Sequence, residues 1–269
     1  MKKDYIDLIK KDSVYAIIPA RSGSKGVKNK NIRCLRGYPL IAFTAAATNM
    51  CGEASRVIIS TDSEYYAEIG KYYGAEAPFL RPAEISGDKS TDIEFMEHAI
   101  TWLAENEGVL PEYFMHMRPT YPLRKPEIVS EAVKRMKADT SATSLRSAHL
   151  APNTPYKWFN LREDGYYKSI KPGLTLDEAN NPRQAFPDVY IPDSYVDVLR
   201  TEFIINNDLM HGDRMIGYVV EGGIDVDAKE DMDFLEYYVS DHSNPVLEYL
   251  QANYKTLEEL SFRNECSDS

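Results

Sequence analysis

The sequence has little cysteine and no long apolar run, and both shortages restrict what the chain can be. Its three cysteines are scattered at Cys34, Cys51 and Cys266, so no CxxC spacing occurs and no disulfide framework is expected. This usage favours a reducing compartment, and we expect a cytoplasmic protein. No apolar run approaches the roughly 20 residues that span a bilayer, and the charged N-terminus lacks the apolar segment of a signal peptide. We therefore expect no membrane partner.

Acidic residues are missing from one stretch of an otherwise acidic chain. Of the 269 residues 42 are Asp or Glu and the formal net charge is -11, yet no Asp or Glu lies between Ser13 and Gly52. A globally negative protein is a poor nonspecific nucleic-acid binder, because phosphate contacts dominate such binding, so we expect no nucleic-acid partner. A local positive region within it suits an enzyme that admits one small anion at one site.

Short β-branched runs alternate with helical patterns along the chain. The alternation predicts βαβ units and a three-layer αβα fold around a mostly parallel, Rossmann-like sheet. Strands are predicted at 14–19, 56–60, 113–117, 141–146, 203–206 and 215–220, and helices at 40–50, 63–73, 91–106, 126–137 and 227–240. Residues 13–240 form the predicted main domain. Within it, residues 151–200 are rich in Pro, Asn and aromatics and are predicted to be a small insertion that acts as a lid, a substrate-facing segment or a dimer arm. Residues 241–269 are predicted to be a C-terminal helical tail.

The strongest functional signal is the stretch ARSGSKGVKNKN at residues 20–31, directly after the first predicted strand. In such sheets ligands bind beyond the carboxyl ends of the strands, where backbone N–H groups and Lys or Arg side chains can cradle a phosphate chain. The loop is neither a P-loop nor a dinucleotide-binding GxGxxG loop. A solvated basic turn is the alternative, but the missing acids and the position after the first strand favour triphosphate binding.

Asp225 and Asp227 stand two residues apart, so both carboxylates point to one face if the segment is extended. Two such carboxylates suit a Mg²⁺ ion that also takes oxygens from a substrate phosphate. The alternative is a capping box, in which Asp227 and Glu230 close the N-terminus of the helix that follows. None of the five histidines stands in a recognisable metal or catalytic-triad spacing.

Four further motifs follow the loop in order. They are LRPAE at 80–84 with ST at 90–91, RPTYPLR at 118–124, PRQ at 182–184, and IDVD at 224–227 with ED at 230–231. With the loop they resemble the five motifs of the acylneuraminate cytidylyltransferases, which are CMP-sialic acid synthetases and relatives. The resemblance implies the Rossmann-like nucleotidyltransferase fold, with residues 13–240 as the cytidylyltransferase domain. It also implies transfer of CMP from CTP to the anomeric hydroxyl of a nonulosonic acid, for cell-surface polysaccharide biosynthesis.

The same resemblance assigns roles at the matching positions. The candidate catalytic residues are Arg21 and Lys30, which would stabilise the triphosphate charge, and Asp225 and Asp227, which would hold a Mg²⁺ cofactor. The candidate CTP-binding residues are Ala20, Arg21, Ser24, Lys30, Asn31, Arg81, Ser90 and Thr91, of which Asn31, Arg81 and Ser90 or Thr91 would contact cytosine. The candidate sugar-binding residues are Arg118, Thr120, Tyr121, Lys157, Arg183 and Gln184, with Arg183 the first choice for a substrate carboxylate, because Arg binds carboxylates bidentately.

Simpler structural roles stay open for some of these residues. Arg81 could form a surface ion pair with Glu84. Thr91 or its neighbour Ser90 could cap the next helix, because Glu94 stands at capping-box distance from Thr91. For Lys and Arg in a loop of the insertion, solvent exposure is the default.

Three departures from the family pattern concern the sugar side and leave the nucleotide side intact. Arg118 replaces the usual Gln, Tyr121 replaces the usual Ser, and IPDSYVD at 191–197 stands where sialic acid enzymes have RPNGAIY. We therefore expect a cytidylyltransferase whose sugar is a relative of N-acetylneuraminate, such as a diacetylated legionaminate. The segment 151–197 also resembles the family's dimer arm, which predicts a homodimer whose partner residues complete each sugar site.

Two other functions fit part of the pattern. A nucleotide-sugar-dependent glycosyltransferase also uses an Asp-x-Asp pair to hold metal and diphosphate, although it has no general need for a triphosphate cradle. A non-catalytic, nucleotide-binding relative is compatible with the departures at Arg118 and Tyr121. The presence of Arg21, Lys30 and both Asp residues favours the enzyme over these two.

Overall fold

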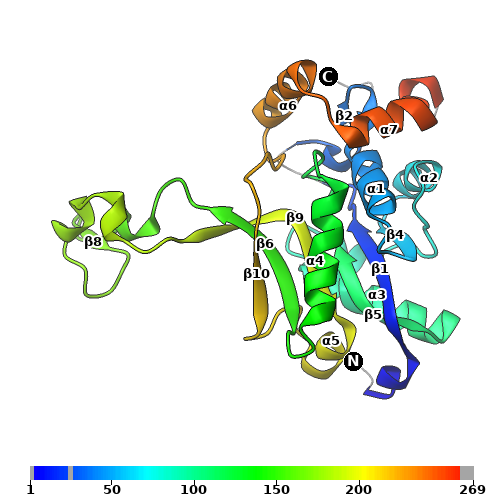
Figure 1. The fold of residues 1–269 in the computed structure, drawn as a ribbon, viewed down its shortest axis with the longest axis horizontal. Coiled ribbons are helices and arrows are strands. Elements are labelled where there is room, and N and C mark those ends of the chain that lie inside the picture. The colour runs from blue at the N-terminus through cyan, green and yellow to red at the C-terminus, as the bar shows by residue number, and fades with distance from the viewer. Residues whose placement is uncertain (1–2, 24–26, 261–269) are drawn as a thin grey trace.

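The computed structural model describes residues 3–23 and 27–260, and its centre is a six-stranded sheet with helices on both faces (Figure 1). The strand order is β10-β6-β9-β5-β1-β4. β9 runs antiparallel to its neighbours β5 and β6, and the other pairs are parallel. The predicted three-layer, mostly parallel fold is confirmed. The strands are β1 (Ile9–Pro19), β4 (Arg56–Ser60), β5 (Leu110–His116), β6 (Ser144–Leu150), β9 (Tyr190–Arg200) and β10 (Met215–Val219).

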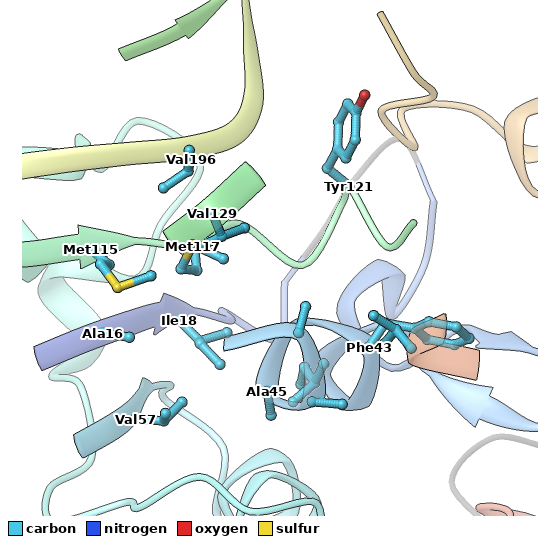
Figure 2. Packing of buried hydrophobic residues seen from close by; sticks show 14 of the residues in the cluster. Ala16, Ile18, Phe43, Ala45, Val57, Met115, Met117, Tyr121, Val129 and Val196 are labelled. Atoms are coloured by element: carbon cyan, nitrogen blue, oxygen red, sulfur yellow. The ribbon is translucent and has the colours of Figure 1, made fainter. Parts of the chain in front are cut away.

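The helices form the outer two layers because each strand of the sheet has two apolar faces. On one face Ala16 and Ile18 of β1 pack with residues of α1, α2, α4, α6 and α7, and on the other Tyr15 and Ile17 pack with α3 and α5. Figure 2 shows the first of these cores, where Ile18 lies beside the α1 residue Ala45. The helices are α1 (Leu40–Cys51), α2 (Glu64–Tyr72), α3 (Asp92–Glu107), α4 (Pro126–Ala138), α5 (Thr201–Asn207), α6 (Lys229–Asp241) and α7 (Pro245–Asn253). No helix in residues 3–23 or 27–260 combines the length and apolar character that a bilayer crossing needs.

Residues 151–189 leave the sheet between β6 and β9 and project from it as an arm (Figure 1). The arm carries a two-stranded antiparallel sheet, β7 (Phe159–Leu161) with β8 (Tyr167–Ser169). A second small ribbon, β2 (Cys34–Leu35) with β3 (Tyr38–Pro39), precedes α1. Short 3₁₀ helices complete the described chain at Lys3–Leu8, Lys30–Ile32, Ala83–Ile85, Pro155–Lys157, Glu178–Asn180, Arg183–Ala185 and Glu258–Leu260.

The structure departs from the prediction at two elements. The apolar run 203–206 is part of helix α5, because a short apolar run does not by itself distinguish a buried strand from a buried helical turn. Strand β9 has no counterpart among the predictions. Its first half holds Pro192, Asp193 and Ser194, and its register against β6 shifts between Arg146 and Ala148, so the alternation that reveals a strand is interrupted.

Candidate active site

A cavity of about 570 Å³ opens where the chain continues beyond the carboxyl ends of β1 and β5. This is the edge of a parallel sheet at which ligands bind. Residues from four of the five motifs line it together: Arg21, Lys30, Asn31, Arg81, Ser90, Thr91, Arg118, Thr120, Asp225 and Asp227. Asp88, Asp92, Phe95 and Ser194 also line the cavity and were not among the predicted residues.

Two cations of the loop after β1, Arg21 and Lys30, are each paired with a carboxylate. Arg21 Nη1 lies 2.9 Å from Asp88 Oδ1, and Lys30 Nζ lies 3.0 Å from Asp227 Oδ1. The described part of the loop is held from the neighbouring strand, because Asp62, just after β4, accepts hydrogen bonds of 2.8 Å from the backbone N–H and the hydroxyl of Ser22. Both cations are therefore held at the cavity by partners that an anionic ligand can replace.

Backbone contacts fix the rest of the first motif. Ala20 is fully buried beside the cavity lining, and its N–H donates to the carbonyl of Ser60 at 2.9 Å. The buried Asn31 side chain donates from Nδ2 to the Arg21 carbonyl at 3.0 Å. Ser24, predicted to bind CTP, lies outside the described residues.

Arg81 is a buried cation at the base of the cavity and not the surface ion-pair partner of Glu84. It is 5% exposed, donates to the Ser60 carbonyl at 2.7 Å and to Ser60 Oγ at 3.0 Å, and its guanidinium stands 4.8 Å from the centre of the Phe95 ring. Burial lowers the pKa of Arg81 to about 10, so it stays charged at neutral pH. A fixed positive charge beside an aromatic ring suits the binding of a polar heterocycle.

Thr91 has the capping role that its sequence position allowed. The Glu94 carboxylate accepts hydrogen bonds from the Thr91 N–H at 2.5 Å and from the Thr91 hydroxyl at 3.0 Å, where α3 begins. Helix formation thus places Thr91 and the adjacent Ser90 at the cavity wall. The capping role and a ligand contact are compatible only if the ligand uses the remaining lone pairs of Thr91 or its backbone.

Asp225 and Asp227 both line the cavity, and neither caps the following helix. The cap of α6 comes from Asp231, whose Oδ2 accepts from the N–H groups of Asp227 at 2.8 Å and Ala228 at 2.7 Å, so the predicted alternative with Glu230 is wrong. The carboxylate of Asp225 accepts a hydrogen bond of 2.5 Å from Ser194 Oγ to Oδ2. Its other oxygen, Oδ1, is buried and receives no hydrogen bond from any residue that the structure describes.

Arg118 lines the cavity and belongs to a cluster of charges around the buried Asp197. Its Nη1 lies 3.1 Å from Asp197 Oδ2 and its Nη2 lies 2.7 Å from Asp92 Oδ2. Asp197 is fully buried and also faces His116 Nδ1 at 3.5 Å and Arg146 Nε at 3.6 Å. Burial alone would raise the pKa of Asp197, but the nearby His116 ring and the charge of Arg118 lower it to about 2. Burial lowers the pKa of His116 itself.

Arg124, the last residue of the third motif, is a fully buried clamp. Its Nε donates to the carbonyl of Tyr195 at 2.6 Å, and its Nη2 donates to those of Arg118 at 2.5 Å and Ser194 at 2.6 Å. Its Nη1 donates to Thr44 Oγ1 at 3.1 Å and to the Tyr121 carbonyl. The guanidinium therefore ties the third motif to β9, and burial lowers its pKa to about 10.

The remaining predicted sugar residues do not line this cavity. Tyr121 is buried, with its ring centre 5.0 Å from that of Tyr195, and it lines a separate, more apolar pocket beside α6. Lys157, Arg183 and Gln184 lie in the arm; Lys157 Nζ donates to the Asn181 carbonyl at 3.0 Å, and Arg183 Nη2 donates to the Ala151 carbonyl at 3.1 Å. Within one chain, Lys157 and Arg183 therefore contact other residues of the arm and not the cavity.

Fold and cavity together define a Rossmann-like nucleotidyltransferase. The family profile described as cytidylyltransferase matches residues 15–264. The chain belongs to the cytidylyltransferase family.

Individual relatives agree with this membership, and a solved structure shares the fold. The chain is 30% identical over 221 residues to an N-acylneuraminate cytidylyltransferase of Escherichia coli, a match that covers 82% of this chain and 50% of the relative. It is 34% identical over 141 residues to a CMP-N,N'-diacetyllegionaminic acid synthase of Legionella pneumophila, covering 52% of this chain and 60% of the relative. These matches span about half of each relative's length. The fold matches that of a CMP:2-keto-3-deoxy-manno-octonic acid synthetase complexed with CTP, with a TM-score of 0.62, 15% identity and coverage of 85% and 99% of the two chains.

Proposed function

We propose that the protein transfers CMP from CTP to the anomeric hydroxyl of a nonulosonic acid and releases pyrophosphate. The observation that carries this proposal is the meeting of four separate sequence motifs in one cavity at the ligand-binding edge of the sheet. The hydroxyl oxygen attacks the α-phosphorus of CTP, its proton is lost, and the bond to the pyrophosphate oxygen breaks. Such a reaction depends on positioning and on charge stabilisation, which are what this cavity offers.

Arg21 and Lys30 are the groups that stabilise the negative charge in this proposal. In the structure each is neutralised by a carboxylate, Asp88 for Arg21 and Asp227 for Lys30. A bound triphosphate would take over these cations, because it brings several negative charges to the same place. The exchange would release the Asp227 carboxylate, whose side chain is 81% exposed, for another cation.

We propose Mg²⁺ as that cation, held by Asp225 and Asp227. The unpartnered, buried Oδ1 of Asp225 supports this, because a buried carboxylate oxygen without a donor is costly unless a cation satisfies it. An ion held by these two carboxylates would complete its shell with substrate phosphate and water. When bound, Mg²⁺ would neutralise phosphate charge and activate the nucleophile.

For the acceptor we propose a diacetylated nonulosonic acid such as a legionaminate. Support comes from the departures in the sequence, because two of them touch each other: Arg118 forms its ion pair with Asp197. With the usual Gln in place of Arg118 and the usual Tyr in place of Asp197, the cavity wall would lack this ion pair. Similarity to a relative named as a CMP-N,N'-diacetyllegionaminic acid synthase points the same way. We expect the reaction in the cytoplasm, the compartment that the scattered cysteines favour.

We further propose a homodimer in which the arm packs on a second copy of the chain. Large apolar side chains stand exposed on it, with Trp158 52%, Leu161 69% and Tyr166 71% exposed. Clustered exposed apolar side chains mark interaction surfaces. Docking on a partner would bring Lys157, Arg183 and Gln184 to another sugar site. Sedimentation of the wild type and of Leu161→Asp tests this: a wild-type dimer weakened in the variant supports it, and a monomeric wild type contradicts it.

The experiment that tests the proposed reaction measures pyrophosphate release with Mg²⁺ from CTP, UTP and GTP against a panel of nonulosonic acids. We expect release only with CTP and only when a nonulosonic acid is present. A glycosyltransferase would instead consume a nucleotide sugar without releasing pyrophosphate from CTP, and a non-catalytic relative would bind CTP without turnover. A faster reaction with N-acetylneuraminate than with every diacetylated analogue would refute the acceptor assignment while leaving the cytidylyl transfer standing.

A further inference from the structure

Ser194 is a cavity residue whose hydroxyl makes one specific contact. Its Oγ donates to Oδ2 of Asp225 at 2.5 Å, and it reaches the cavity from β9, a strand that the sequence patterns did not reveal. A hydrogen bond from a neutral hydroxyl to a carboxylate is stronger than one between neutral groups. The bond therefore restrains the orientation of the Asp225 carboxylate.

The position of Ser194 is itself fixed by the buried network around Arg124. The guanidinium of Arg124 is fully buried and donates to the Ser194 carbonyl at 2.6 Å. On the other side of the contact, the N–H of the fully buried Val226 donates to the Thr120 carbonyl at 2.8 Å and anchors the backbone next to Asp225. Both partners of the hydroxyl–carboxylate bond thus stand on restrained backbone.

A carboxylate held at one oxygen cannot rotate freely about its Cβ–Cγ bond. With Oδ2 occupied by Ser194, Oδ1 keeps one position, and this is the buried oxygen that lacks a donor within the described chain. Fixing the free oxygen before a cation arrives removes a rearrangement that binding would otherwise require.

We infer that Ser194 is a positioning residue that orients the Asp225 carboxylate for a divalent cation. The inference rests on the proposed function of Asp225 as a metal ligand. Ser194 needs no contact with substrate for this role, and its hydroxyl acts only through Asp225. The side chain can therefore be shortened without removing a cation ligand or the Arg124 contact, which uses the Ser194 backbone.

The experiment measures Mn²⁺ affinity at a fixed, saturating concentration of CTP by the electron paramagnetic resonance signal of the free ion, with the Mn²⁺ that CTP alone binds subtracted. Loss of an outer-shell partner of a metal ligand typically weakens binding about 10- to 100-fold, so we expect Ser194→Ala to raise the Mn²⁺ Kd by at least about tenfold. The Mg²⁺ concentration for half-maximal turnover should rise in parallel. A matched control is Ser130→Ala. Ser130 lies on α4, away from the cavity, and its hydroxyl donates to the Glu53 carboxylate at 2.7 Å. Its loss should leave both values unchanged.

Asp225→Asn separates failure of this inference from failure of the proposed metal site. If Asp225→Asn abolishes Mn²⁺ binding but Ser194→Ala changes the Kd by less than twofold, the positioning role is refuted and the metal site stands. If the wild type with CTP binds no Mn²⁺ beyond what CTP alone binds, or if Asp225→Asn binds it as well as the wild type, the metal site itself is refuted and the inference falls with it. Equal weakening by Ser130→Ala would show a general loss of structure and would also overturn the inference.

Discussion

Replacing Arg124 with Met tests whether one buried guanidinium holds the acceptor side of the cavity together. All five of its N–H donors are used, and four of the acceptors are backbone carbonyls, those of Arg118, Tyr121, Ser194 and Tyr195. Methionine fills similar volume but donates nothing. Each buried carbonyl left without a donor costs about 1–3 kcal/mol. Relief of the desolvated charge offsets part of this, so we take about 1 kcal/mol for each carbonyl and expect a total loss of about 4 kcal/mol.

The assay is urea unfolding followed by circular dichroism, with the free energy of unfolding extrapolated to water. For a chain of this size the same loss corresponds to a decrease in Tm of roughly 8–16 °C. The control is Arg162→Met, because Arg162 is 55% exposed at its side chain and pairs with Asp164 on the arm, where an exposed ion pair is worth about 0–1 kcal/mol. A loss below about 1 kcal/mol for Arg124→Met would refute the clamp.

The remaining predictions concern turnover, pH and the fit around Tyr121. Arg21→Ala or Lys30→Ala should lower turnover about 10²–10³-fold with the unfolding curve unchanged, since each removes a preorganised charge donor; a loss under tenfold would remove that residue from the catalytic set. Burial lowers the pKa of His116 in the folded protein, so the unfolded chain takes up a proton at a higher pH than the folded protein does. The free energy of unfolding should therefore fall as pH drops below about 6.5, by up to about 1.4 kcal/mol per pH unit. The slope of unfolding free energy against pH should be smaller in His116→Asn, and an equal slope would contradict this. Gly223→Ala should displace Tyr121 and destabilise the fold, because an added Cβ would stand 1.9 Å from the Tyr121 hydroxyl oxygen, and a variant as stable as wild type would show that the ring is not so confined.

The meeting of Arg21, Lys30 and Asn31 in one cavity was predictable because their signals are local in sequence. Arg21, Lys30 and Asn31 follow one strand within a single loop, and the loop's position after that strand determines where they point. The pair Asp225 and Asp227 was likewise readable from its spacing. Its helix-capping alternative failed because Asp231 stands one position further into the helix and takes the N–H groups.

The contacts of Arg118 and Asp225 were less predictable because they join distant segments. Ser194 reaches Asp225, and Asp197 reaches Arg118, only because β9 inserts antiparallel between β5 and β6. The strand is irregular at its start and follows an arm with weak periodicity, so no alternation indicated it. Asp88 carried no signal beyond being an acid in a short polar loop, and its pairing with Arg21 depends on the tertiary fold.

Tyr121 lies away from the cavity that Arg118 and Thr120 of its motif line, in the separate pocket beside α6. Figure 2 shows the Tyr121 hydroxyl pointing away from the core residues Met115 and Met117. The ring packs on Tyr195 and lines the pocket beside α6, so this departure from the family pattern reshapes the support behind the cavity and not its lining. Acceptor selectivity is therefore expected to respond more to Arg118 and Asp197 than to Tyr121.

The central claim is the transfer of CMP to a nonulosonic acid, and ³¹P nuclear magnetic resonance of the complete reaction tests it most directly. The protein is incubated with CTP, Mg²⁺ and N,N'-diacetyllegionaminic acid. We predict that the three CTP resonances are replaced by one phosphodiester resonance of the CMP-sugar and by pyrophosphate in equal amount. Unchanged CTP, or phosphate products that form equally without the sugar acid, would contradict the account.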